Sequence, residues 1–161
     1  HRAMYPGQAS AVQSGQNAGP KREGKTVMPR RILIVEDEPV LAKHMQTYFR
    51  YHSHGASDVR TAPDATQALE ILETFVPDAL VMDYGLPDMD GLRLYAEITR
   101  RKAKKINCVM ITGNPTEQLA EEARDMGIHN IVCKPFRFIL LQRVLEALDT
   151  AAAGRASGAN K

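Results

Sequence analysis

The sequence predicts an α/β fold with a doubly wound, five-stranded parallel sheet. Between residues 31 and 149, short apolar runs alternate with segments of helical periodicity, which is the pattern of repeated strand–helix units. A chain of 161 residues is large enough for one domain with a substantial core. Its apolar fraction of 43% and charged fraction of 25% are those of a globular protein. These observations predict one domain rather than two.

Five strands are expected from short aliphatic runs bounded by polar or turn residues. They lie at residues 31–36, 57–61, 78–83, 106–112 and 130–133. Helices are expected between them at residues 39–52, 63–75, 90–103, 115–126 and 136–149. In the first, second and fourth helices, apolar residues recur three or four positions apart and define a face for the core. These residues are Leu41, Met45 and Tyr48; Ala65, Ala68, Leu69 and Leu72; and Leu119, Ala120, Ala123 and Met126.

The fourth expected helix has the clearest boundaries. Asn114 is the expected N-cap, Pro115 takes the first helical position and Glu117 can complete a capping box. Gly127 follows the last helical residue, as is common at helix ends. These boundaries place Thr112-Gly113 in a loop just before a helix N-terminus, where a hydroxyl group and backbone amides would face an anion.

Charged residues follow three of the expected strands at the point where each strand ends. Glu36-Asp37 end the first apolar run, Asp83 closes the third, and Lys134-Pro135 follow the fifth. In an open parallel sheet, ligands bind in the crevice beyond the carboxyl ends of the strands. Three carboxylates in that crevice repel one another unless a cation joins them. A hard divalent ion with oxygen ligands is the natural partner.

Each of these residues also has an ordinary structural explanation. Asp83 alone is an aspartate at the start of a loop, and Glu36-Asp37 alone are a helix N-cap with a first-turn acid. Their joint occurrence with Lys134-Pro135 and Thr112 at matching strand ends favours a shared site.

Four motifs at these strand ends carry a resemblance to a known family. They are Ile34-Val35-Glu36-Asp37-Glu38-Pro39; Leu80-Val81-Met82-Asp83 with Pro87-Asp88-Met89-Asp90-Gly91; Val109-Met110-Ile111-Thr112-Gly113; and Cys133-Lys134-Pro135-Phe136. Each motif is weak alone, but the four in this order are highly specific. Residues 31–149 resemble the receiver domain of two-component response regulators. The resemblance implies the strand order 2-1-3-4-5 and a flavodoxin-like three-layer sandwich.

The resemblance also implies a phosphorylation-dependent signalling switch rather than an enzyme. Asp83 would be the phosphoacceptor and would take a phosphoryl group from the phosphohistidine of a sensor histidine kinase or a phosphotransfer protein. Asp37 and Asp83 would ligate Mg²⁺ directly, Glu36 through a water molecule, and Gly85 through its backbone carbonyl. This set agrees with the preference of Mg²⁺ for a few carboxylates together with retained waters.

The residues implied to bind the phosphoryl group are Lys134, Thr112 and Gly113. Lys134 would pair with Asp83 first and with a phosphoryl oxygen afterwards, and Thr112 would hydrogen-bond another oxygen. Ile131 departs from the family, which often has an aromatic residue three positions before the lysine. An aliphatic side chain cannot swing like a ring, so the switch is expected to rely on shifts of loops and helices.

The last expected helix begins with more apolar residues than one buried face can hold. If Leu141, Leu145 and Leu148 face the sheet, some of the remaining apolar residues must be exposed or half-buried, namely some of Phe138, Ile139, Leu140 and Val144. Two interpretations stay open. One is an oversized contact between helix and sheet. The other is a surface for a homodimer or an effector, formed together with the fourth helix and the fifth strand.

The net charge of +2 comes from two basic ends, and residues 31–149 are acidic. An acidic domain is a poor match for nucleic acid. No apolar stretch is long enough to span a membrane and no signal-peptide region is present, so we expect a cytoplasmic location without membrane contact. Residues 1–30 are expected to be a disordered extension or a remnant of cloning, and residues 150–161 a flexible tail or linker. Cys108 and Cys133 are expected to be buried and too far apart to bond.

Two further functions have to be weighed against the switch. A phosphorylation-independent interaction module of the same fold stays an alternative. A hydrolase of phosphate esters is disfavoured, because Gly85 stands where an Asp-x-Asp motif would place a second catalytic acid after Asp83.

Overall fold

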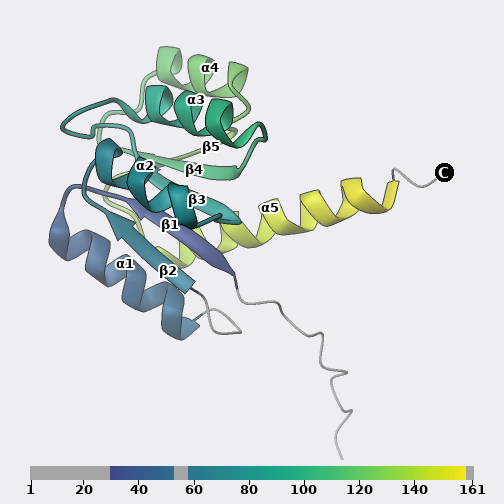
Figure 1. The fold of residues 1–161 in the computed structure, drawn as a ribbon, viewed down its shortest axis with the longest axis horizontal. Coiled ribbons are helices and arrows are strands. Elements are labelled where there is room, and N and C mark those ends of the chain that lie inside the picture. The colour runs from purple at the N-terminus through teal and green to yellow at the C-terminus, as the bar shows by residue number, and fades with distance from the viewer. Residues whose placement is uncertain (1–29, 53–57, 159–161) are drawn as a thin grey trace, which may run out of the picture.

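Five parallel strands form the central layer of the computed structural model, which describes residues 30–52 and 58–158 (Figure 1). The strands are β1 (Arg31–Val35), β2 (Asp58–Ala62), β3 (Ala79–Asp83), β4 (Asn107–Thr112) and β5 (Asn130–Cys133). Their spatial order is β2-β1-β3-β4-β5, which confirms the expected fold class and strand order. The N-terminal extension was expected to be disordered, and its residues 1–29 lie outside the described ranges.

Helices cover both faces of this sheet and complete three layers. They are α1 (Pro39–His52), α2 (Ala65–Thr74), α3 (Gly91–Lys102), α4 (Glu117–Asp125) and α5 (Phe138–Gly158). Buried side chains of α1 and α5 share one core cluster with one face of the sheet. Those of α2, α3 and α4 share a second cluster with the other face. Because β1 and β3 are covered on both sides, they are almost continuous apolar runs.

The register of the sheet brings the charged strand ends to one edge. Val35 of β1 pairs with Met82 of β3, so Glu36 and Asp83 follow at the same level. On the other side, β5 ends beside Thr112, the last residue of β4. Parallel pairing without slippage therefore gathers the carboxyl ends of β1, β3, β4 and β5.

Helix α4 begins later than the sequence predicts. Thr116, not Asn114, is its N-cap, with an extended backbone and a side-chain oxygen that accepts from the Leu119 amide at 3.1 Å. The prediction failed because the Asn114 amide donates to the Thr112 hydroxyl at 3.1 Å, which holds Asn114 in the preceding loop. The predicted end is confirmed, since Gly127 follows the helix with a positive φ of 91°.

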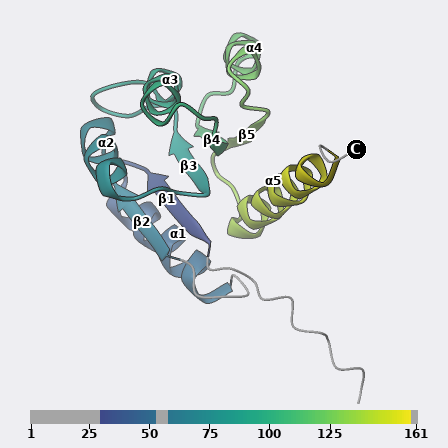
Figure 2. The same ribbon diagram turned by 45° about the vertical axis from the view of Figure 1, so that its right-hand side comes forward.

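Helix α5 continues to Gly158, past the expected end at residue 149. The structure thus describes residues 150–158 as helix where the sequence predicts a flexible tail. Its last turns extend beyond the sheet (Figure 2), so local preference rather than packing accounts for them. The alanines at residues 151–153 are the strongest helix formers. Although α5 has 21 residues, no helix in the described part of the chain is long and apolar enough to cross a membrane.

The two cysteines are free, as predicted. Cys133 pairs in register with Thr112, four positions along β4 from Cys108. The expectation that both thiols are buried is wrong for Cys133, which is exposed. The reason is its position, since Cys133 ends β5, one of the two edge strands of the sheet.

Candidate functional site

Asp83 lies at the centre of the charged edge. It is the last residue of β3 and is only 6% exposed. Its Oδ1 accepts a hydrogen bond from the Gly85 amide at 3.0 Å, and its Oδ2 accepts one from Lys134 Nζ at 2.7 Å. The two oxygens are therefore held in different directions, one toward the following loop and one toward β5.

Lys134 joins two of the acids. Its Nζ lies 3.1 Å from Glu36 Oε2 in addition to its contact with Asp83. Burial by itself would lower the pKa of Lys134, but its hydrogen bonds to Asp83 and Glu36 outweigh burial and raise that pKa. The side chain is therefore a stable cation between two carboxylates. A cis peptide bond precedes Pro135.

Glu36 is the most buried acid of the site, at 1% exposure. Burial raises the pKa of its carboxyl group to about 7, and the negative charge of Asp83 adds to this effect. The Glu38 amide, which donates to Oε1 at 3.1 Å, and Lys134 act in the opposite direction. Lys134 Nζ donates its hydrogen bond to Glu36 Oε1 at 3.3 Å, whereas the buried Oε2 accepts no hydrogen bond from the described residues. Glu36 Oε2 thus has Lys134 as an ion-pair partner at 3.1 Å but no hydrogen-bond donor among the described residues.

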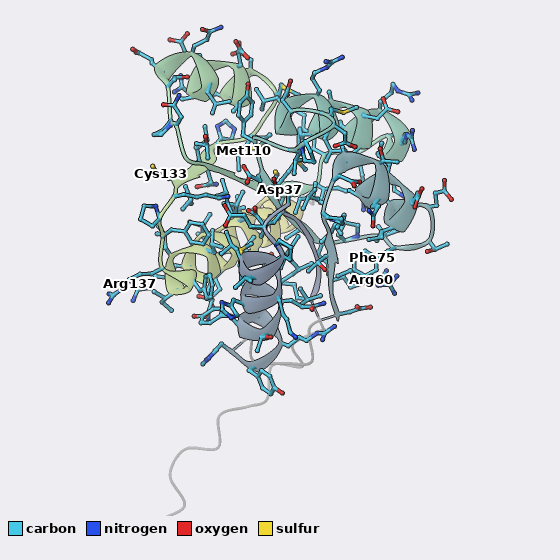
Figure 3. The ribbon with its side chains drawn as sticks, turned by 90° about the vertical axis from the view of Figure 1, so that its left-hand side faces the viewer. Asp37, Arg60, Phe75, Met110, Cys133 and Arg137 are labelled. Atoms are coloured by element: carbon cyan, nitrogen blue, oxygen red, sulfur yellow. The ribbon has the colours of Figure 1, made fainter. Side chains whose placement is uncertain are left out.

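Glu36, Asp37 and Asp83 form a cluster that could hold a metal ion. One carboxylate oxygen from each residue lies within 4.8 Å of the others. Asp37 is exposed and lies just above the first turn of α1 (Figure 3), so the cluster opens to solvent on that side. A donor set made of three carboxylates suits a hard divalent ion.

Thr112 and Gly113 lie beside this cluster at the end of β4. Thr112 is 4% exposed, and its hydroxyl oxygen accepts from the Asn114 amide. Within the described residues, Thr112 makes no hydrogen bond to the carboxylates. Gly113 is exposed, and nothing lies within 4 Å of the place that a Cβ would take. The structure thus brings together Asp83, the two other acids and Lys134, and leaves Thr112 as a neighbour.

Gly91, which begins α3 directly after the loop that follows Asp83, has a structural role that its sequence motif did not reveal. A Cβ on Gly91 would lie 2.8 Å from the Asp83 carbonyl oxygen and 2.8 Å from Met110 Sδ, so only glycine fits there. The Gly91 amide donates to the Tyr84 carbonyl at 2.8 Å, which closes the loop. The sequence signal was the Asp90-Gly91 pair, which marks a turn but not its close approach to Asp83.

The start of α5 agrees with the expected excess of apolar residues. Leu141 and Leu145 are fully buried, whereas Ile139 and Leu140 are 40% and 45% exposed. An oversized contact with the sheet therefore does not account for Ile139 and Leu140. Phe138 is partly buried.

Ile131, the variant position in β5, is partly buried. It pairs in register with Met110 and packs against the cluster under α2, α3 and α4.

Comparison with known proteins assigns this arrangement to a family. Residues 32–146 match the family model described as the response regulator receiver domain. The transcriptional regulatory protein PdtaR of Mycobacterium tuberculosis is 33% identical over 118 residues, 73% of this chain and 56% of that protein. The two-component response regulator PhoP of Pseudomonas aeruginosa is 34% identical over 124 residues, 77% of this chain and 53% of that protein.

A solved structure shows the same fold. The signal receiver domain of an HD domain-containing protein from Pseudomonas fluorescens superposes with a TM-score of 0.67 and 28% identity, over 78% of this chain and 99% of that one. The chain spans about half the length of the curated relatives it matches. The matched family, the strand order and the carboxylates gathered at the strand ends agree, and the chain belongs to the response regulator receiver domain family.

Proposed function

We propose that Asp83 accepts a phosphoryl group from the phosphohistidine of a sensor histidine kinase or a phosphotransfer protein. The observation that carries this proposal is the environment of Asp83, which is 6% exposed, 2.7 Å from Lys134 Nζ and clustered with two more acids. A carboxylate is a weak nucleophile, so alignment and charge neutralisation provide most of the rate enhancement. An Asp83 oxygen attacks phosphorus, the phosphorus–nitrogen bond breaks with its electron pair passing to the imidazole, and an acyl phosphate forms.

The acidic cluster is assigned to Mg²⁺. Asp37, Asp83 and the Gly85 carbonyl would hold the ion, with Glu36 acting through a water molecule. Glu36 Oε2, which accepts no hydrogen bond from the described residues, supports this assignment, because a metal-bound water is a suitable donor to it. When bound, the divalent ion supplies positive charge that offsets the three carboxylates and the incoming phosphoryl oxygens.

Lys134 and Thr112 are the proposed protein donors to the phosphoryl group. The raised pKa of Lys134 keeps its ammonium group protonated, so it can leave Asp83 Oδ2 and donate to a phosphoryl oxygen. The Thr112 hydroxyl accepts from the Asn114 amide, and its own hydrogen is not used by that bond. Beside it, the exposed Gly113 leaves space for the phosphoryl group.

The proposed output is a change of the surface formed by α4, β5 and α5. Ile139 and Leu140 give this surface exposed apolar side chains, suited to a second copy or to an effector. Because Ile131 is aliphatic, the change is assigned to shifts of the β4–α4 loop and α4 rather than to a rotating ring. A cytoplasmic location agrees with a histidine kinase as phosphodonor. The activity controlled by this surface belongs to the whole protein.

The test is incubation with Mg²⁺ and acetyl phosphate, followed by intact mass measurement. We expect the wild-type chain to gain one phosphoryl group and Asp83→Asn to gain none. Asp58→Asn, at the exposed start of β2, is the matched control and should be modified like the wild type.

Absence of a mass gain in the wild type, with the fold intact by circular dichroism, would refute the switch. A gain that persists in Asp83→Asn would place the phosphoacceptor at another residue.

A further inference from the structure

The loop between β3 and α3 is closed by contacts of its own backbone. Gly85 and Asp90 form an isolated antiparallel bridge, and the Gly91 amide donates to the Tyr84 carbonyl at 2.8 Å. The Gly85 amide also donates to Asp83 Oδ1 at 3.0 Å. The position of Gly85 and one Asp83 oxygen are therefore linked to the conformation of the whole loop.

Asp88 ties the tip of this loop to α2. Its Oδ1 accepts from the Ala65 amide at 2.9 Å, and its Oδ2 accepts from the Thr66 amide at 3.0 Å and the Thr66 hydroxyl at 2.8 Å. These amides lie in the first helical turn, where N–H groups have no partner within the helix. The hydrogen bonds from Ala65 and Thr66 lower the pKa of Asp88, and a negative charge there complements the helix dipole.

The anchor is not duplicated by the helix's own cap. Asp64, the N-cap of α2, accepts from the Gln67 amide at 2.8 Å and from the Gln67 side chain at 3.2 Å. Asp64 and Asp88 thus bind different amides of the same helix end. They differ in origin, because Asp64 belongs to the α2 segment whereas Asp88 belongs to the loop that follows Asp83.

Helix α2 is a rigid attachment point. Its residues Ala65, Ala68 and Leu72 are buried at 1%, 0% and 2% exposure in the core cluster on that side of the sheet. A loop held to this helix at Asp88 and to β3 at its other end has little freedom between the two points. Gly85, whose carbonyl is a proposed metal ligand, lies in that interval.

We propose that Asp88 is a positioning residue, which holds the loop from Tyr84 to Asp90 against α2 and so keeps the Gly85 carbonyl in place for the metal ion. The inference rests on the proposed function only through the assignment of the metal site. Asp88 itself would contact neither the metal ion nor the phosphoryl group. Groups that orient metal ligands from outside the ligand set typically change metal affinity by about 10- to 100-fold when removed.

The test compares Asp88→Ala with Asp64→Ala. Both variants remove one carboxylate from the N-terminus of α2, so both should lower thermal stability. We expect only Asp88→Ala to weaken Mg²⁺ binding, by on the order of tenfold in dissociation constant measured by isothermal titration calorimetry. Asp64→Ala should bind Mg²⁺ within about twofold of the wild type.

Milder variants guard against loss of the fold. Asp88→Asn keeps one acceptor oxygen and should restore part of the affinity, while Thr66→Val removes the hydroxyl partner and should give a smaller loss. With acetyl phosphate, Asp88→Ala should need more Mg²⁺ for half-maximal phosphorylation and reach nearly the wild-type rate at saturating Mg²⁺.

Two results would overturn the inference. One is wild-type Mg²⁺ affinity in Asp88→Ala, and the other is an equal loss of affinity in Asp64→Ala, which would reduce the role of Asp88 to helix stability. The binding measurement does not depend on phosphorylation, so it distinguishes failure of this inference from failure of Asp83 as the phosphoacceptor.

Discussion

Lys134 decides the electrostatics of the candidate site at the scale of single residues. It places one positive charge between Asp83 and Glu36, at 2.7 Å and 3.1 Å from their oxygens. The resemblance to receiver domains predicted its pairing with Asp83, but not its contact with Glu36. That contact depends on the distance between the ends of β1 and β5, which are separated by two strands in the sheet. This distance cannot be predicted from any local pattern of residues.

The first prediction concerns the pH dependence of stability. The pKa of Glu36 is about 7 in the folded protein against an ordinary value of 4.5. The folded state therefore holds this proton to higher pH than the unfolded chain, and the stability it contributes is lost as the pH rises from about 4.5 through about 7. In urea denaturation with EDTA, we expect the free energy of unfolding of the wild type to fall over this window more steeply than that of Glu36→Gln.

The matched control for this prediction is Glu121→Gln, because Glu121 is an exposed acid of α4. Its pH profile should follow that of the wild type. Parallel profiles for wild type and Glu36→Gln would contradict a raised pKa at Glu36.

At the scale of elements, the boundaries of loops and helices control the geometry of the site. The helical period of α4 was readable from the sequence, but its N-cap was assigned two residues too early. Both Asn114 and Thr116 are common N-caps, so propensity alone could not separate them. The hydrogen bond from the Asn114 amide to the Thr112 hydroxyl holds Asn114 in the loop and leaves Thr116 as the N-cap. The same loop then presents Thr112 and Gly113 beside the acidic cluster.

The N-cap of α4 can be tested by substitution. Thr116→Ala removes the acceptor of the Leu119 amide and should lower the free energy of unfolding by about 1 kcal/mol. Asn114→Ala keeps the backbone amide that binds Thr112 and should stay within about 0.5 kcal/mol of the wild type. Chemical denaturation measures both values. A larger loss in Asn114→Ala would restore Asn114 as the cap.

The close approach at Gly91 gives a second prediction at this scale. Gly91→Ala places a methyl group 2.8 Å from the Asp83 carbonyl oxygen, and relief of this clash should cost about 1–3 kcal/mol of stability in urea denaturation. Gly113→Ala is the matched control, since nothing lies within 4 Å of its Cβ position. Equal effects of the two substitutions would contradict the close approach at Gly91.

At the scale of the whole molecule, α5 runs from the carboxyl ends of the strands, where the acidic cluster lies, toward their amino ends. It follows Lys134-Pro135, exposes Ile139 and Leu140 near its start, and is held by Arg30 further along. Arg30 donates to the Leu145 carbonyl at 2.8 Å and to Asp149 Oδ1 at 2.7 Å. Beyond the residues bound by Arg30, the helix extends away from the sheet (Figures 1 and 2).

The last prediction concerns association through α5. With a phosphoryl analogue and Mg²⁺, the wild type should self-associate in sedimentation velocity, whereas Ile139→Ser with Leu140→Ser should remain monomeric. Because both residues are 40% or more exposed, the double variant should lose less than about 1 kcal/mol of stability. Val76→Ser, at 42% exposure elsewhere on the surface, should associate like the wild type. A wild type that is monomeric both with and without the phosphoryl analogue would contradict self-association and leave an effector as the partner of this surface.

The sequence by itself determined the fold class, the strand order through its resemblance to receiver domains, and the acids and lysine that end the strands. It could do so because strands covered on both faces are continuous apolar runs, and the polar residue that ends each run is visible locally. Only the tertiary structure decided the contact of Lys134 with Glu36, the raised pKa of Glu36 and the anchoring of Asp88 to α2. Those features depend on distances between elements far apart in the chain, and burial and charge at such distances follow only from the packed fold.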